Sequence, residues 1–319
     1  MAAGLTLVAG TANPDLASRI SAELDTPLAH RTLSSFPDGE LQVELAQSVR
    51  GQDVYLIQST CPPVERHLLE LVLVADACHR GGAARLTGVV PYFGYARQDR
   101  RTTRRQALGA RVLADLVDAS AIDRLVVVDL HTPAVEGFFA IPIEHVSAVP
   151  ILAEALRPFV RERSIVVAPD LGAVKLAEHY ARLLQLPIAI VHKTRVSGRE
   201  VKVRQIVGDV RERSPIVVDD MLSTGATIEA AIVALRAAGC QGDAVVAVSH
   251  GLFVAQAEDV LAPLGLRQLV VTDSITERPD RLPVDVRSLG PLLAEAIRRL
   301  HADQSLGDLY SAVLPLTRP

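Results

Sequence analysis

The chain repeats one pattern: a short run of β-branched apolar residues, then a stretch whose apolar residues recur at helical spacing. The apolar runs predict strands at Leu5–Ala9, Val54–Gln58, Leu86–Pro91, Leu125–Asp129, Ile165–Ala168, Ile188–Val191, Ile216–Asp219, Ala244–Ser249 and Gln268–Thr272. The stretches between them predict helices at Pro14–Leu24, Val64–Arg80, Leu108–Asp118, Pro150–Arg163, Ala173–Leu184, Thr224–Ala238 and Pro291–Ala302. Strands that are apolar throughout are typical of parallel sheets covered on both faces. We therefore predict an α/β fold with mainly parallel sheets flanked by helices.

The length indicates two such units, because 319 residues is about twice the usual domain of roughly 150 residues. Two prolines, Pro142 and Pro150, bracket a stretch that reads as an irregular connection. We place the boundary there, with domains at 1–146 and 147–319. The last predicted helix, Pro291–Ala302, could pack back on the first domain.

Composition narrows the class of protein. Hydrophobic residues make up 49% of the chain, enough for a large core, so disorder is not its main state. The 33 Lys and Arg against 37 Asp and Glu leave a net charge of −4, which argues against a nucleic-acid binder. Three cysteines give no disulfide framework, and no stretch resembles a signal peptide or a membrane span. We expect a cytoplasmic protein with no nucleic-acid or membrane partner.

Acidic residues or an imidazole follow four of the predicted strands. They are Asp129 with His131, then Asp170, the pair Asp219 and Asp220, and Asp273. Ligands of open α/β sheets bind at the carboxyl ends of the strands. A single acid there can instead cap the following helix, and that alternative stays open for Asp273. Together, oxygen ligands and an imidazole suit Mg²⁺ carrying a polyphosphate.

The most specific stretch is IVVDDMLSTGATI, residues 216–228. Its small and hydroxylated residues allow backbone N–H groups to approach an anion at the positive end of a helix. The two carboxylates disfavour that anion and are better suited to accept hydrogen bonds from sugar hydroxyls. The stretch therefore predicts a sugar-phosphate site; the alternative is a plain helix cap at Ser223 or Thr224.

Two further stretches concentrate positive charge. Residues 97–105, RQDRRTTRR, hold five arginines around one acid and suit a polyphosphate or a nucleotide. Residues 193–204, KTRVSGREVKVR, could form a mobile loop, with Ser197-Gly198 as its flexible point, that neutralises charge in a transition state. Solvated basic loops would look the same. No P-loop motif is present, which excludes a P-loop phosphotransferase.

Taken together, the sequence resembles the ribose-phosphate pyrophosphokinases, the synthetases of phosphoribosyl diphosphate, from about residue 5 to residue 310. The likeness is carried by FPDGE (36–40), RGQDVYLIQST (50–60), PYFGYARQDR (91–100), DLHTPAVEGFF (129–139), APDLGAV (168–174), KTR (193–195), VVDDMLSTGAT (217–227) and GPLLAEAIRRLH (290–301). The chain departs from the commonest bacterial pattern at Ser223, at 105–107 and at 171–173.

The resemblance implies two similar phosphoribosyltransferase-type domains and the reaction ATP + ribose 5-phosphate → 5-phosphoribosyl 1-diphosphate + AMP, with Mg²⁺ as cofactor. The ribose 1-hydroxyl would attack the β-phosphorus. By position, the resemblance implies ATP contacts at Phe36, Asp38, Gly39, Glu40, Arg97, Gln98 and Asp99, and Mg²⁺ ligands at His131 and Asp170. It implies ribose 5-phosphate contacts at Asp219, Asp220, Ser223, Thr224, Gly225, Ala226 and Thr227, and catalytic roles for Lys193 and Arg195.

The family also implies a homo-oligomer built from dimers, with a hexamer as one option, since the loop at 36–40 is often lent by a neighbouring subunit. Three alternatives remain at this point. A non-catalytic regulatory homologue should have lost His131, Asp170, Lys193 or Arg195, all of which are present. A phosphoribosyltransferase would not need the RQDR or FPDGE stretches. The same chemistry on a related pentose phosphate is the third.

Overall fold

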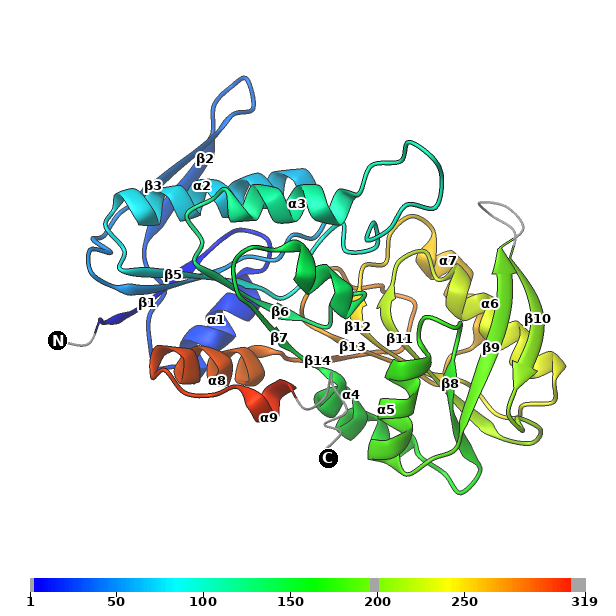
Figure 1. The fold of residues 1–319 in the computed structure, drawn as a ribbon. Coiled ribbons are helices and arrows are strands. Elements are labelled where there is room, and N and C mark those ends of the chain that lie inside the picture. Colours follow the sequence, from blue (N-terminus) through cyan, green and yellow to red (C-terminus); the bar gives the residue numbers. More distant parts are fainter. Residues whose placement is uncertain (1–2, 196–200, 311–319) are drawn as a thin grey trace. The chain divides into compact units, whose positions relative to one another are not determined.

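The computed structural model describes residues 3–195 and 201–310, which form two compact units (Figure 1). Unit 1 comprises the described residues up to Ser147, the short segment Ser274–Thr276, and the described residues from Ser288 on. Unit 2 comprises Ala148–Asp273 and Glu277–Arg287. The sequence of unit 2 is thus inserted in that of unit 1.

Unit 1 is built on a five-stranded parallel sheet in the order β1-β4-β5-β6-β7. Its strands are β1 (Leu5–Ala9), β4 (Asp53–Ile57), β5 (Arg85–Val90), β6 (Arg124–Val128) and β7 (Ile143–Val146). Between β1 and β4 the chain forms a separate antiparallel hairpin of β2 (Arg31–Ser35) and β3 (Leu41–Leu45). This hairpin projects from the body of the unit (Figure 1).

Helices cover both faces of the sheet of unit 1 (Figure 1). They are α1 (Pro14–Glu23), α2 (Val64–Arg80), α3 (Gly109–Asp118), α8 (Gly290–His301), the short α9 (Gly307–Tyr310) and the 3-10 helix η1 (Pro133–Phe138). Apolar residues of α2 and α3 pack with Val54, Leu56 and Val90 in one core. On the other face α1 packs against α8, which comes from the far end of the sequence.

A buried ionic cluster fastens the end of α8 to the sheet of unit 1. Asp53, at the start of β4, is 1% exposed and accepts two hydrogen bonds from the guanidinium of Arg85, at 2.8 and 2.6 Å. Its Oδ2 also lies 2.7 Å from Nδ1 of His301, the last residue of α8. Arg85 donates further to the carbonyl of Leu300 and to Asp303. Two residues at the amino edge of the sheet therefore hold the chain's last long helix.

Unit 2 has the same core topology, β8-β11-β12-β13-β14, with all five strands parallel. These strands are β8 (Ser164–Ala168), β11 (Ser214–Leu222), β12 (Val245–Gly251), β13 (Gln268–Thr272) and β14 (Val284–Arg287). Again a hairpin follows the first strand, here β9 (Ile188–Arg195) and β10 (Val201–Val207). In unit 2 the hairpin joins the sheet, because β9 pairs with β8.

The helices of unit 2 also lie on both faces of its sheet (Figure 1). They are α4 (Val149–Leu156) with the 3-10 turn η2 (Arg157–Phe159), α5 (Val174–Leu184), α6 (Ala226–Ala237), and α7 (Ala257–Leu261) with η3 (Ala262–Leu264). Apolar residues of α6 and α7 share a core with Val217, Val246 and Val271. Among the described helices of both units, none has the length and apolarity to span a membrane.

The structure corrects one prediction about the stretch 141–150. It is not irregular: Ile143–Val146 form β7, and α4 begins at Val149. The strand pairs with β6 over its whole length, from Leu125↔Ile143 to Val128↔Val146. The sequence analysis missed this strand because IEHV is only half apolar and is bounded by proline.

Candidate active site

Many of the predicted site residues lie at the carboxyl edges of the two main sheets, while residues 36–40 lie in the loop of the separate β2–β3 hairpin. Because the core strands of each unit are parallel, the loops that follow them all leave from one edge. In unit 1 this edge carries the loops after β5 and β6, which hold residues 97–105 and His131. In unit 2 it carries Asp170 after β8 and the segment 219–227 at the end of β11.

Asp219 and Asp220 lie within β11, which continues to Leu222 instead of ending at Asp219 as predicted. Burial raises the pKa of Asp219 well above its ordinary value, and the nearby carboxylates of Asp220 and Asp170 raise it further. Three acids thus crowd one edge of unit 2. Such a cluster gains stability from groups that donate hydrogen bonds or carry positive charge, such as sugar hydroxyls or a cation.

Asp170 accepts hydrogen bonds from the backbone of its own loop. Its Oδ1 accepts hydrogen bonds from the backbone N–H of Gly172, at 2.9 Å, and of Ala173, at 3.3 Å. These bonds shape the turn that leads into α5. The side chain that shapes this turn is therefore also the one predicted to bind the metal ion.

The loop after β11 presents the start of α6 without a side-chain cap. The N-cap residue is Gly225, at φ +81°, and no side chain bonds to the first helical N–H groups there. The alternative of a cap at Ser223 or Thr224 is therefore wrong. A Cβ on Gly225 would meet Cγ of Leu261 at 2.9 Å, so this turn needs glycine for its conformation and for space. Uncapped N–H groups at the positive end of a twelve-residue helix form a suitable place for a phosphate.

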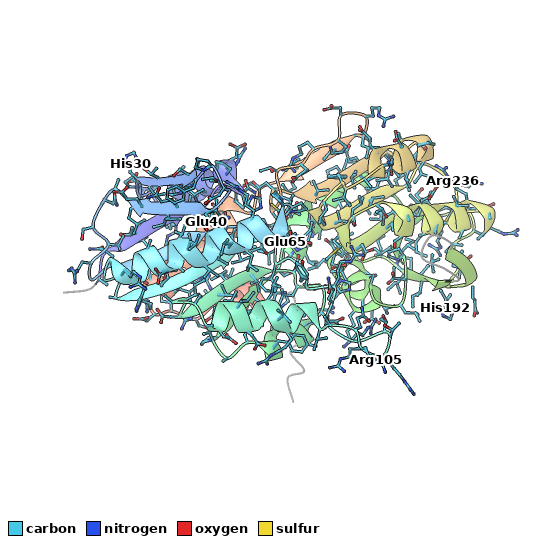
Figure 2. The ribbon with its side chains drawn as sticks, turned by 90° about the horizontal axis from the view of Figure 1, so that it is seen from above. His30, Glu40, Glu65, Arg105, His192 and Arg236 are labelled. Carbon is cyan, nitrogen blue, oxygen red and sulfur yellow. The ribbon has the colours of Figure 1, made fainter. Side chains whose placement is uncertain are left out.

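The loop after β5 exposes its arginines. Arg97, Arg100, Arg101, Arg104 and Arg105 are all exposed, and among the described residues none of them forms an ion pair. Figure 2 shows Arg105 on this loop, outside the helices of the unit. Oε1 of Gln106 organises the turn by accepting from the backbone N–H groups of Thr102 and Thr103. The loop is therefore an ordered turn with exposed positive charge.

The first turn of α2 connects this loop to the loop of the β2–β3 hairpin. Tyr95 donates from its hydroxyl to Glu65 Oε1, 2.8 Å away, and Glu65 lies at the start of α2 (Figure 2). The next residue, Arg66, donates to Oγ of Ser35, 3.4 Å away, at the end of β2. The two predicted ATP-binding segments, 36–40 and 97–99, thus flank one helix turn in unit 1.

The hairpin loop itself is a tight turn with an exposed aromatic side chain. Phe36 is 47% exposed, its N–H donates to the carbonyl of Glu40, and Gly39 has φ +94°. Asp38 Oδ1 accepts from the N–H of Glu40 at 3.1 Å. An exposed phenyl ring on a polar turn suits stacking against a planar ring such as a nucleobase.

His131 lies in the loop after β6, which begins in a strained conformation. Asp129 has φ +37°, and its N–H donates to the carbonyl of Val146. The loop then enters η1, where Oγ1 of Thr132 accepts from the N–H of Ala134. His145 of β7 contacts this loop from beneath, through Leu130 and Glu136. His145 could not be found from the sequence, because a lone histidine in the stretch IPIEHVSAVP belongs to no motif.

Lys193 and Arg195 belong to the backbone of β9, where they pair with Val203 and Val201 of β10. Their side chains lie outside the described residues. So does the predicted flexible point at Ser197-Gly198.

Comparison with known proteins shows what family this arrangement belongs to. A model for the N-terminal domain of ribose phosphate pyrophosphokinase matches residues 5–120, and a phosphoribosyl transferase domain model matches residues 150–263. The ribose-phosphate pyrophosphokinase of Maricaulis maris is 41% identical over 96% of this chain and all of its own length. The chain belongs to the ribose-phosphate pyrophosphokinase family.

Other relatives agree. The ribose-phosphate pyrophosphokinase of Parasynechococcus marenigrum is 39% identical over 310 residues, covering 96% of this chain and 93% of its own. The crystal structure of phosphoribosylpyrophosphate synthetase from Mycobacterium smegmatis superposes with a TM-score of 0.88 at 37% identity, covering 94% of this chain and 99% of that one. The predicted family and the α/β fold with two phosphoribosyltransferase-type domains are confirmed.

These findings also bear on two of the three alternatives, the regulatory homologue and the phosphoribosyltransferase. The N-terminal match over 5–120 is specific to the pyrophosphokinases, so a phosphoribosyltransferase is excluded. Relatives named as the enzyme match nearly the whole chain, which favours the catalytic interpretation over a regulatory homologue. The chain is therefore an enzyme of this family, a diphosphotransferase of nucleotide biosynthesis.

Proposed function

We propose that this chain transfers the diphosphoryl group of ATP to the 1-hydroxyl of ribose 5-phosphate, releasing AMP and 5-phosphoribosyl 1-diphosphate. The observation that carries this proposal is the segment from β11 to α6: the carboxylates of Asp219 and Asp220, then residues 221–225, then the uncapped start of α6. That order matches a sugar phosphate, whose hydroxyls donate to carboxylates and whose phosphate accepts from backbone N–H groups.

For ribose 5-phosphate, we assign Asp219 and Asp220 to the ribose hydroxyls and residues 223–227 to the 5-phosphate. The positive φ of Gly225 turns the chain so that the first N–H groups of α6 lie open. The raised pKa of Asp219 indicates that this carboxyl gains from hydrogen-bond donors, which the sugar hydroxyls supply.

For ATP, we assign Phe36, Asp38, Gly39 and Glu40 to the adenine side, and Arg97, Gln98 and Asp99 to the nucleotide. Support comes from the exposed phenyl ring, the exposed guanidinium groups and the helix turn that both loops flank. Arginine suits phosphate oxygens because its planar fork donates two parallel hydrogen bonds.

Mg²⁺ is the cofactor we propose, with His131 and Asp170 as ligands. The described residues contain no group of three His, Cys, Asp or Glu side chains placed to hold a metal ion by themselves. That fits Mg²⁺, which usually binds through one or two carboxylates, water and substrate phosphates. When bound, the ion neutralises the charge of the transferring diphosphoryl group.

In the chemical step, Lys193 and Arg195 would donate to the phosphoryl oxygens as charge develops, while Asp219 and Asp220 orient the sugar. Phosphoryl transfer needs little covalent help from a protein, so positioning and charge neutralisation supply most of the rate. A site with carboxylates, cations and backbone N–H groups is suited to that task.

We further propose that residues 1–146 form the ATP side and residues 147–319 supply the ribose 5-phosphate side, with the C-terminal helix α8 belonging to unit 1. We also propose a cytoplasmic homo-oligomer built from dimers. The exposed β2–β3 hairpin supports the oligomer, because a projecting loop with an exposed phenyl ring is available to a neighbouring subunit. Light scattering on the active enzyme tests it, and an active monomer would contradict it.

The reaction is tested by separating nucleotides on an ion-exchange column after incubation with ATP, ribose 5-phosphate and Mg²⁺. We expect AMP, and only when the sugar phosphate is present. ADP in its place would identify a monophosphoryl kinase and overturn the proposed transfer. No turnover with any pentose phosphate would revive the regulatory homologue.

A further inference from the structure

His145 is a buried histidine with both ring nitrogens engaged by the loop that carries His131. It lies on β7 and is 3% exposed. Its Nε2 accepts a hydrogen bond from the backbone N–H of Leu130, 3.0 Å away. Its Nδ1 lies 2.6 Å from Oε1 of Glu136, on η1. The ring therefore spans the loop, fastening the residue before His131 and the residue five positions after it.

This pair of contacts fixes the position of the ring proton. A backbone N–H can only donate, so Nε2 must be the unprotonated nitrogen. The proton is therefore on Nδ1, where the Glu136 carboxylate accepts it. Glu136 thus selects the one neutral tautomer in which His145 can hold the N–H of Leu130.

Other contacts hold the two ends of the loop. Asp118 of α3 accepts from the N–H groups of Ala140 and Ile141, at the far end. Val135 is fully buried in the core of the unit. Asp129, at the near end, is held through its N–H by the carbonyl of Val146. Between these anchors, the bond from the Leu130 N–H to His145 fixes the peptide next to His131.

We propose that His145, with its tautomer set by Glu136, is a positioning residue that holds His131 for metal binding. This inference rests on the proposed role of His131. His145 acts through the backbone and lies beneath the loop, while His131 is exposed. Displacing a site residue by about 1 Å can cost a factor of roughly 100 in rate. A hydrogen bond that fixes the peptide next to His131 can therefore affect the reaction.

The test changes Glu136, whose side chain is 37% exposed, because replacing the buried His145 risks the fold. Glu136→Ala leaves the Nδ1 proton without its acceptor and frees the ring to take the other tautomer, which would set two donors, N–H of Leu130 and Nε2–H, against each other. Glu136→Gln keeps an acceptor oxygen at the same reach. The matched control is Glu144→Gln, the preceding residue of β7, which pairs with Arg124.

Two readouts separate positioning from a general loss of stability. In metal-free protein, the ¹⁵N signals of the His145 ring report which nitrogen carries the proton, with His145→Gln used to assign them. The affinity for Mn²⁺ alone is measured from the free-ion signal in electron paramagnetic resonance. His131→Ala provides the value expected when the proposed ligand is lost.

We expect Glu136→Ala to weaken Mn²⁺ binding roughly 10-fold and to change the His145 tautomer, in the range found when groups that orient a metal ligand are removed. Glu136→Gln and Glu144→Gln should stay within about twofold of the parent. One outcome would overturn the positioning role alone: Glu136→Ala binds Mn²⁺ as tightly as the parent, while His131→Ala binds it more weakly. Unchanged affinity in His131→Ala would overturn the metal assignment beneath it, while the nucleotide-product assay would still stand.

Discussion

At the scale of single residues, the carboxylates of Asp219 and Asp220 on β11 affect both the stability of the fold and the proposed binding of the sugar. Asp219 has a raised pKa because it is buried beside Asp220 and Asp170. Replacing it by Asn removes one of the repelling charges and one acceptor for a sugar hydroxyl. We therefore expect Asp219→Asn to keep or raise the melting temperature without substrate, and to raise the KM for ribose 5-phosphate roughly 10- to 100-fold, the scale of a lost hydrogen bond to a charged group.

The control for this variant is Asp209→Asn, an exposed acid of the same unit. It should alter neither quantity. A rise in the KM for ATP alone would show that the sugar assignment of Asp219 is wrong.

Lys193 gives a second prediction at this scale. If it donates to the phosphoryl group only in the transition state, Lys193→Ala should lower kcat by roughly 10²–10³ while the fold survives. Steady-state kinetics together with a circular-dichroism melt measure the two effects. Lys175→Ala, an exposed residue of α5, is the matched control. An unchanged kcat in a folded Lys193→Ala protein would remove this residue from the mechanism.

The residues that sequence reasoning could and could not find differ in kind. Asp170 and the segment 219–227 follow apolar strands, so their place at a sheet edge could be predicted from the sequence. His145 could not, because its importance depends on two contacts made across the loop, to Leu130 and Glu136. A bond between elements leaves no periodic trace in the sequence.

At the scale of elements, the start of α6 depends on one glycine. Gly225 has φ +81°, and an added Cβ would lie 2.9 Å from Leu261. Gly225→Ala should therefore lower stability by about 1–2 kcal/mol or more through backbone strain and crowding. It should also raise the KM for ribose 5-phosphate, since the N–H groups that face the phosphate would shift.

Gly265→Ala provides the comparison for this variant. Gly265 also has a positive φ, +56°, but an added Cβ there has open space and the residue lies away from 223–227. Urea unfolding and kinetics of both variants separate strain from crowding. Equal losses of stability, with no change in KM for either, would show that the turn at Gly225 does not shape the phosphate site.

Some of the strands could be predicted from the sequence and others could not. The central strands, such as β4 and β8, are buried along their whole length, so their apolar runs marked them in the sequence. The edge and hairpin strands β2, β3, β7, β10 and β14 were missed. Strands such as RTLSS and LQVEL are partly exposed and mix polar with apolar residues, so pairing, not burial, defines them.

At the scale of the whole molecule, the cluster around Asp53 links strands β4 and β5, from the first third of the chain, to the end of α8, near its C-terminus. Burial disfavours the Asp53 carboxylate, but hydrogen bonds from Arg85 and His301 outweigh burial, and the pKa of Asp53 is lowered below its ordinary value of 3.8. A lowered pKa stabilises the fold above the ordinary value, and that stabilisation is lost as pH falls through the folded pKa.

We expect Asp53→Asn to lose about 1–3 kcal/mol of unfolding free energy at pH 7, the range for removing a partner of a buried polar group. The gap to the parent should shrink as pH falls below 3.8, because the unfolded parent then takes up a proton at Asp53 while the folded parent still holds this carboxylate ionised, and that uptake favours unfolding. Urea unfolding at pH 7 and pH 3.5 measures this. Asp76→Asn, which breaks an exposed pair with Arg80 on α2, should cost no more than about 0.5 kcal/mol at either pH. A gap for Asp53→Asn that is constant with pH would contradict the assignment.

Because unit 2 lies within the sequence of unit 1, the order of synthesis and the order of folding cannot coincide. A ribosome adding roughly 5–20 residues per second finishes β7 on the order of ten seconds before it makes α8. During that interval the first unit lacks α8, one of the helices on one face of its sheet, while the whole of unit 2 is completed. The nascent chain therefore exposes an apolar surface until α8 is made. A chain truncated after residue 287 would keep that surface exposed permanently.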